Sequence, residues 1–216
     1  MAALNVHKYM LRLGIALLLA ILTSVSSFAQ QRHFQYFVMG GVAYPLGDKD
    51  FTAGWDAGLH LGLGLGYSLN ANTTVVGTVE VSNFPLDDEA YLLRNGFPLA
   101  DNRAEEGSAT IMTAALSLKY SMSRSRSGEA LFFTAGANFS RFNEGDILLS
   151  IIEDGEGFST VIRREGQTAL GISAGTGFNV HLSSKSYLFI EARYTMLFLD
   201  KPSIQFVPLR MGVAFR

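Results

Sequence analysis

The sequence predicts an all-β protein, an eight-stranded antiparallel up-and-down transmembrane β-barrel. Three observations lead to this fold class. Apolar residues alternate with small or polar residues in eight segments, the connections between segments alternate in length, and the apolar face carries no charge through its central positions. Period-two alternation is typical of strands whose two faces meet chemically different surroundings.

The second of these segments shows the alternation most clearly, because it reads WDAGLHLGLGLGYSL. Its leucines share one face of a strand and its glycines share the other. A helix would scatter the leucines around its circumference, and each glycine would cost a helix about 1 kcal/mol relative to alanine. The eight predicted strands are Phe34–Ala43, Trp55–Leu69, Thr73–Asn83, Ala109–Met122, Leu131–Arg141, Thr168–Leu182, Tyr187–Leu197 and Gln205–Arg216.

Pro208 lies inside the last segment, so we expect a bulge or a missing ladder hydrogen bond there. Tight polar turns at 70–72, 123–129 and 183–186 follow the second, fourth and sixth segments, whereas 84–108 and 143–167 are long loops. Short turns at one end and long loops at the other are typical of an outer-membrane barrel. The 143–167 loop holds two apolar runs, Ile147–Ile152 and Phe158–Ile162, which predict a strand–turn–strand extension above the membrane.

The composition of the second face decides which face points outward. A soluble barrel such as a lipocalin would expose that face, and soluble surfaces are rich in Lys, Glu and Asp. Here it holds mostly Gly, Ser, Thr, Ala and Asn, the small residues that a narrow eight-stranded lumen accommodates. We therefore expect the apolar face to meet lipid. Aromatic residues near the short-turn end of the apolar face predict an interfacial girdle of Tyr36, Tyr67, Tyr120 and Phe215.

The N-terminus predicts an export signal over residues 1–29 and a barrel domain over 30–216. Lys8 and Arg12 precede an apolar run, Leu13–Leu22, that is too short for a spanning helix. Removing the signal leaves 15 basic and 19 acidic side chains. This acidic balance argues against a nucleic-acid partner, and the absence of Cys excludes a disulfide framework.

Charged residues on the small-residue face predict a polar network inside the lumen. Such charges should pair, because isolated charges are costly in a narrow barrel. Strand counting places His60 nearly opposite Glu80, and Arg193 close to Arg210 with Glu191 within diagonal reach of an arginine. This arrangement fits a packed polar core better than a conducting path, although both remain open. The predicted network is Asp56, His60, Glu80, Lys119, Glu191, Arg193 and Arg210.

Three other motifs could indicate nucleotide binding, catalysis or metal binding, but each lacks a feature that such a site needs. The G-x-G-x-G spacing of Gly62–Gly66 lacks the following helix that a dinucleotide loop needs. His181 and Ser183 have the His-x-Ser spacing of outer-membrane lipid A deacylases, with Glu191 eight residues beyond Ser183. The sequence around them lacks the other residues of those enzymes. Acidic clusters in the loops lack EF-hand spacing, which favours solvated charge, with weak divalent bridging to lipopolysaccharide phosphates as the alternative. We therefore expect no catalytic residues, no cofactor and no metal.

The whole predicted mature chain resembles the OmpA/OmpX-type family of small outer-membrane barrels. The resemblance rests on the eight strands, the run GGVAYPLGD at Gly40–Asp48 and the ending PLRMGVAF at Pro208–Phe215. It implies an outer-membrane location, contact with lipid and lipopolysaccharide, and assembly by the barrel-assembly machinery, which reads a terminal aromatic residue. In this sequence the aromatic residue Phe215 is followed by Arg216, which departs from the family pattern. It also implies a non-enzymatic role in envelope integrity or surface interaction, with a ligand at loops 84–108 and 143–167. The alternatives are a minor porin and a lipid A-modifying enzyme.

Overall fold

The computed structural model describes residues 34–47, 49–52, 54–94, 96, 102–105, 107–122, 130–153, 156–162, 166–199 and 203–215. The predicted export signal, the 123–129 turn, the centre of the 143–167 loop and Arg216 lie outside these residues. None of the helices in the described part of the chain is long and apolar enough to cross a membrane.

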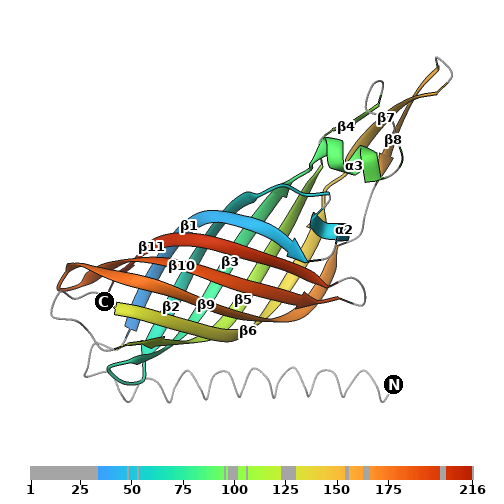
Figure 1. Cartoon of the computed structure of the whole chain (residues 1–216). Helices are drawn as coiled ribbons and strands as arrows, with labels where there is room; N and C mark the ends of the chain where they lie inside the picture. The colour runs from blue at the N-terminus through green and yellow to red at the C-terminus, as the bar shows by residue number, and fades with distance from the viewer. Residues whose placement is uncertain are drawn as a thin grey trace, which may run out of the picture. The chain divides into compact units, whose positions relative to one another are not determined.

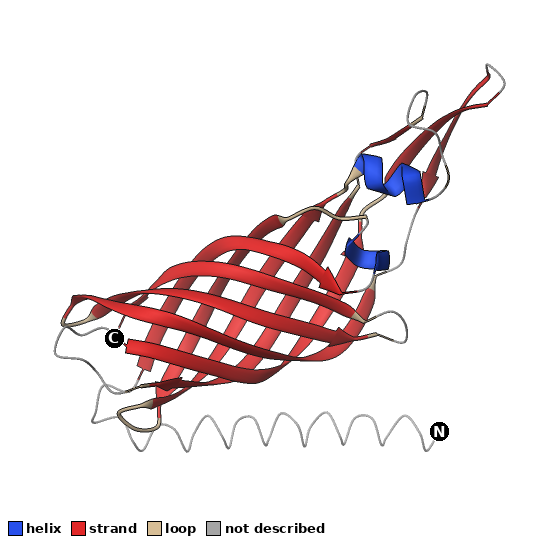
Figure 2. Cartoon of the chain, viewed as in Figure 1, coloured by secondary structure: helices blue, strands red, loops and turns tan. Residues whose placement is uncertain are grey.

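The described residues form a closed antiparallel barrel of eight strands (Figures 1 and 2). Its order is β1-β11-β10-β9-β6-β5-β3-β2, and β2 closes the ring by pairing with β1. Every step is an antiparallel pair, as the predicted up-and-down fold class requires. The strands are β1 (Phe34–Gly47), β2 (Gly58–Ser68), β3 (Thr73–Pro85), β5 (Ser108–Ser121), β6 (Ala130–Glu144), β9 (Gln167–Ser183), β10 (Ser186–Phe198) and β11 (Ile204–Phe215).

The outer surface of the barrel is apolar, which confirms the predicted orientation of the strands. Leu63, Leu116 and Leu170 are 62%, 63% and 67% exposed, although leucine is normally buried in a soluble protein. Their inward neighbours are small or buried. The leucines of β2 thus form part of the apolar outer surface of the barrel.

One detail of the strands differs from the sequence-based expectation, and one agrees with it. The second strand begins at Gly58, and Trp55 instead forms an isolated bridge with Leu86 and is buried. At Pro208 the ladder between β10 and β11 pairs Ala192 with Leu209 and resumes at Thr195 and Phe206. The register is unchanged across the gap, so the proline removes ladder pairing without a bulge, as expected for a residue without an N–H.

The described parts of the long loops contain strands and short helices. The predicted strand–turn–strand extension is present as β7 (Ile147–Glu153) paired with β8 (Glu156–Ile162), and β4 (Arg103–Glu105) adds to β7 from the other long loop. Two short helices, α2 (Lys49–Thr52) and α3 (Asp88–Arg94), were not expected. Asp87 caps α3, because its Oδ1 accepts a hydrogen bond from the Ala90 N–H at 3.0 Å. Asp87, which the sequence analysis counted with Asp88 and Glu89 among the acidic clusters of the loops, is thus a helix cap.

The barrel interior contains more large apolar side chains than the composition of the inner face suggested. One group, here called the mouth cluster, lies at the long-loop end and includes Phe51, Trp55, Phe84, Phe142 and Phe206. A second group, the lower cluster, lies toward the short-turn end and includes Phe37, Met39, Phe132, Tyr187 and Phe189. The interior therefore holds large apolar side chains beside the predicted polar network. Inward phenylalanines occur where a strand is apolar on both faces, as in Tyr36–Met39 and Leu131–Phe133.

Candidate functional site: a charged cluster inside the barrel

The glycines of β2 create the space that the inner side chains occupy. A Cβ added to Gly62 would lie 3.0 Å from the Glu80 side chain and 3.2 Å from Met39. A Cβ on Gly66 would lie 2.8 Å from the Phe37 ring. Larger residues on this face of β2 would displace both a buried carboxylate and the lower cluster, so the glycine run lets larger neighbours fill the lumen.

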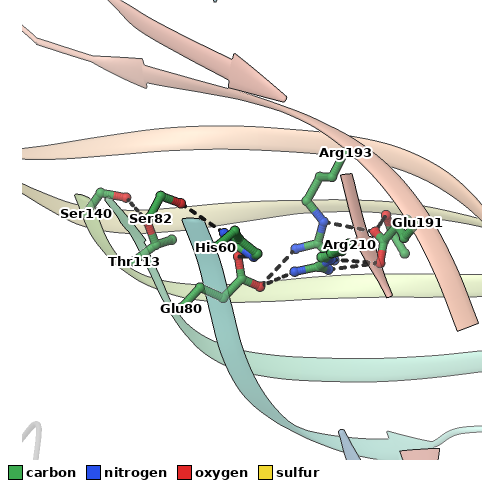
Figure 3. Close-up of polar contacts among 9 residues, drawn as sticks. His60, Glu80, Ser82, Thr113, Ser140, Glu191, Arg193 and Arg210 are labelled. Atoms are coloured by element: carbon green, nitrogen blue, oxygen red, sulfur yellow. Dashed lines mark hydrogen bonds and ion pairs between the residues drawn. The ribbon is translucent and has the colours of Figure 1, made fainter. Parts of the chain in front are cut away.

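Two glutamates and two arginines form an alternating ion-pair cluster midway along the interior (Figure 3). Arg210 donates to Glu80 at 2.5 Å through Nη1 and to Glu191 at 2.9 Å through Nη2. Arg193 donates to Glu191 at 3.0 Å through Nε and approaches Glu80 at 3.6 Å. Thr134 adds a hydrogen bond to Glu191 at 2.8 Å. All four charged side chains are buried, so the cluster neutralises charge in a low-dielectric interior.

The cluster joins opposite walls of the barrel. Glu80 comes from β3, Glu191 and Arg193 come from β10, and Arg210 comes from β11. In the closed strand order, β3 and β10 are separated by three strands on either side, so they face each other across the lumen. The ion pairs between Glu80 and the two arginines therefore cross the interior.

His60 lies beside this cluster in an arrangement that resembles a hydrolytic triad in composition alone. Its Nδ1 lies 2.9 Å from Ser82 Oγ, and its Nε2 lies 3.8 Å from Glu80 Oε2. A serine nucleophile must reach its substrate, but Ser82 is 2% exposed and His60 is 1% exposed. Glu80 is also held more closely by Arg210 than by His60. This arrangement favours a packing role for His60 over catalysis.

Lys119 lies on the short-turn side of the charged cluster, among aromatic rings. Its Nζ is 3.8 Å from the centre of the Phe132 ring and 5.1 Å from that of Tyr187, and it donates to Asn179 Oδ1 at 3.0 Å. The rings of Phe37 and Phe189 lie further out. Cation–π contacts of this kind are strongest where water is excluded. The rings and the Asn179 amide therefore help to stabilise a buried ammonium group.

The structure brings five of the seven predicted network residues into one cluster: His60, Glu80, Glu191, Arg193 and Arg210. The register pairs Glu191 directly with Arg210, and it pairs Gly62 with Glu80, so His60 meets Glu80 diagonally. Lys119 is inside the barrel but has its own aromatic surroundings. Asp56 precedes β2, and its side chain is exposed, outside the cluster.

Comparison with known proteins assigns the family. The outer membrane protein β-barrel domain family matches residues 15–215. The chain belongs to this family. Neisserial surface protein A has a TM-score of 0.53 and 14% identity, with 84% of this chain and 96% of that chain covered. A major outer membrane protein from Thermus thermophilus has a TM-score of 0.53 and 15% identity, with coverages of 85% and 99%. These two likenesses show the fold. No curated protein matches the chain.

In an outer-membrane barrel of this family, aromatic side chains gather at the membrane surfaces. Tyr36 pairs with Phe215 across β1 and β11, and Tyr67 packs edge-on against Phe34 with ring centres 5.3 Å apart. Tyr120 lies near the end of β5 at the same end of the barrel. Tyr36, Tyr120 and Phe215 are exposed and Tyr67 is half-buried. All four predicted girdle residues thus lie at the short-turn end.

Several interior residues were missed by sequence reasoning. Ser82 bonds His60 and could have been found from its inward position opposite His60 on the neighbouring strand. Thr134 and Asn179 bond Glu191 and Lys119, each of which lies two strands away in the barrel, so pairing of neighbouring strands does not predict these contacts. The aromatic rings around Lys119 come from β1, β6 and β10. Their meeting with a lysine of β5 depends on the stagger of the barrel, which alternation in the sequence does not specify.

Proposed function

We propose that the protein acts in the outer membrane as a closed, non-enzymatic barrel that serves envelope integrity or surface interaction through its long loops. The observation that carries this proposal is the ion-pair cluster that crosses the lumen between β3 and β10–β11. A solute would have to separate Glu80 from two arginines, and removing one partner of a buried pair costs about 3–5 kcal/mol.

Both ends of the interior support a closed barrel. Toward the long loops, the mouth cluster places Phe51 of α2 against Phe84 and Phe142, with ring centres 5.5 Å and 6.1 Å apart. Toward the short turns, Tyr187 donates to Gln35 at 2.6 Å, and Gln35 donates to Ser68 at 2.8 Å. An aqueous path would have to cross the mouth cluster, the charged cluster and the hydrogen-bonded side chains of Tyr187, Gln35 and Ser68.

The folded extension of β4, β7 and β8 supports a surface role for the loops, since long loops on a rigid scaffold commonly carry binding function. Phe158 and Val161 of β8 are 59% and 49% exposed, and they lie outside the barrel strands that meet lipid. These two residues are three apart, so their side chains lie on opposite faces of β8. In the membrane orientation that we propose, both belong to the extracellular loops.

Complementation of a deletion strain tests which of the two roles applies. The variants are the wild type, Phe158→Ser combined with Val161→Ser, and Ser159→Ala as a control on the same strand. For envelope integrity, deletion sensitises cells to detergent and all three variants restore resistance. For surface interaction, deletion reduces cell adhesion and only the double variant fails to restore it. A deletion strain that shows neither detergent sensitivity nor reduced adhesion would contradict the proposal.

A minor porin is the second candidate, favoured by the number of charged side chains inside the barrel. Liposome swelling with small sugars tests it: a closed barrel gives the rate of protein-free liposomes, whereas a porin gives rates that fall with solute size. The barrel-assembly machinery remains the expected assembly partner, and lipid and lipopolysaccharide the expected surroundings.

A lipid A-modifying enzyme has less support. Ser183 Oγ lies 2.8 Å from Ser186 Oγ in a short turn, and the side chain of His181 is exposed. Glu191, the carboxylate that could orient His181, is held inside the barrel by Arg193 and Arg210. Lipid A deacylation that is lost in Ser183→Ala would establish the enzymatic alternative and contradict our proposal.

A further inference from the structure

The outer surface of the barrel changes from apolar to polar near the long-loop ends of β3, β5, β6 and β9. Five outward-facing residues, here called the outer patch, mark this change: Asn83, Thr110, Arg141, Asn143 and Thr168. The register pairs Asn83 with Thr110, Thr110 with Asn143, and Arg141 with Thr168. Directly paired residues of neighbouring strands lie on the same face and in contact, so the outer patch is continuous across four strands.

The apolar surface begins next to the outer patch, on its short-turn side. Met112 pairs with Arg141, and Phe139 pairs with Leu170, two residues beyond Thr168. Met112, Phe139 and Leu170 are 55%, 54% and 67% exposed. In the membrane orientation proposed above, these side chains meet the hydrocarbon of the outer leaflet, and the outer patch lies at the level of its headgroups.

Arg141 carries the only charge at the outward-facing positions of the eight barrel strands, within the bounds given above. Its Nε donates to Asn143 Oδ1 at 3.2 Å, and Asn143 lies two residues nearer the long-loop end. This bond directs the exposed guanidinium away from the apolar surface. Its other N–H groups have no partner among the described residues. A cation beside lipid needs a polar headgroup or a counter-charge, and the described chain places no carboxylate against this one.

We infer that the outer patch binds a phosphate group of lipid A, with Arg141 pairing with its charge. A guanidinium presents two parallel N–H groups, which match two phosphate oxygens. Thr110 accepts a hydrogen bond from Asn83 at 2.9 Å, so its own hydroxyl hydrogen can be donated to the ligand, as can that of Thr168. The acyl chains would then lie along the apolar surface beside the patch.

The width of the outer patch favours lipid A over a phospholipid. Neighbouring strands lie about 4.8 Å apart, so four strands span about 14 Å. A single phosphodiester headgroup would meet Arg141 alone. The phosphorylated sugar pair of lipid A also offers hydroxyl groups to the rest of the patch. This inference rests on the proposed outer-membrane orientation, which places the outer patch in the leaflet that contains lipopolysaccharide.

Binding of lipid A to the purified wild-type barrel tests this inference. Native mass spectrometry in detergent measures dissociation constants for three probes: lipid A with its phosphates, lipid A from which they have been removed, and phosphatidylglycerol. We expect the phosphorylated form to bind about tenfold or more tightly than either of the others, because charge-assisted hydrogen bonds are the strong ones. Equal affinity for the two forms of lipid A, or for phosphorylated lipid A and phosphatidylglycerol, would overturn the inference.

Arg141→Gln is the variant that removes the charge. It should weaken binding of phosphorylated lipid A by about tenfold or more and leave binding of the dephosphorylated form unchanged. Arg103→Gln is the matched control, since Arg103 is also exposed but lies on β4, outside the barrel strands. The control should bind like the wild type, and heat-modifiable gel mobility checks that both variants are folded. Equal losses in the two variants would contradict the assignment of Arg141.

The lipid A site and the closed barrel can fail separately. A barrel that carries no current in planar bilayers but binds both forms of lipid A equally would overturn the site alone. A barrel that conducts ions but prefers phosphorylated lipid A, and loses that preference in Arg141→Gln, would overturn closure and support the site.

Discussion

At the scale of single residues, Glu191 is the side chain that holds the interior cluster together. It accepts hydrogen bonds from both arginines and from Thr134. Desolvating a carboxylate is expensive, and here two cations and a hydroxyl offset the cost. The cluster therefore stabilises the barrel only as a complete set, because each charge removed leaves another uncompensated.

Glu191→Gln should destabilise the barrel without opening a pore. The neutral amide leaves two buried arginines facing one remaining glutamate, so we expect a loss of about 3–5 kcal/mol. Urea unfolding followed by gel mobility measures the loss. Glu89→Gln is the control, since Glu89 is exposed on α3. Equal stability of the two variants would show that the cluster contributes nothing to folding.

The sequence could predict which residues face inward but not all of their partners. The alternation of inward and outward positions along each strand predicts that five charged residues point inward: His60, Glu80, Glu191, Arg193 and Arg210. The short turns set the register between neighbouring strands. The contact between Glu80 and Arg210 is different, because it joins strands that are not adjacent. It depends on barrel closure and stagger, which no local pattern encodes.

At the scale of elements, the leucines of β2 anchor the strand in the hydrocarbon layer. Leu63 lies mid-strand and is 62% exposed, whereas Leu69 lies in the short turn and is 55% exposed. The two residues have similar exposure but lie at different depths. Depth in the bilayer, rather than exposure, should therefore set the cost of a charge at each position.

Leu63→Lys should destabilise the barrel by about 2–4 kcal/mol, and Leu69→Lys by about 0–1 kcal/mol. Equilibrium unfolding in lipid vesicles compares the two, with the same chemical change in each. Equal losses, or a larger loss at Leu69, would contradict the proposed position of the membrane.

The mouth cluster packs residues of α2 against the barrel strands at the long-loop end. Phe51→Ala removes a ring buried against Phe84 and Phe142, a change that typically costs about 3–5 kcal/mol in a core. We expect faster proteolysis of the long loops while the barrel strands remain protected. Leu93→Ala, at a residue that is 62% exposed on α3, should leave cleavage unchanged. Cleavage rates that match the wild type in Phe51→Ala would argue against a folded mouth.

The elements differ in how well sequence predicts them. The eight barrel strands follow from alternation, which extends over most of the length of each strand. Helix α2 has four residues, too few for a periodic signal. Helix α3 carried a readable signal in Asp87 as a cap and acids in its first turn, but the acidic residues were interpreted as loop charge.

At the scale of the whole molecule, the protein is a barrel with an apolar outer surface and three layers of buried side chains inside. The mouth cluster, the charged cluster and the lower cluster follow one another from the long loops to the short turns. Each layer joins several strands, so closure and stability should depend on the same side chains. We propose that the loops beyond the barrel carry the function.

Conductance of the purified wild-type barrel in planar lipid bilayers tests this closure most directly. We predict a current at the level of protein-free bilayers, because the ion pairs between Glu80 and the two arginines cross the lumen. Reproducible stepwise currents from folded barrel, identified by its heat-modifiable gel mobility, would contradict the account and favour a channel.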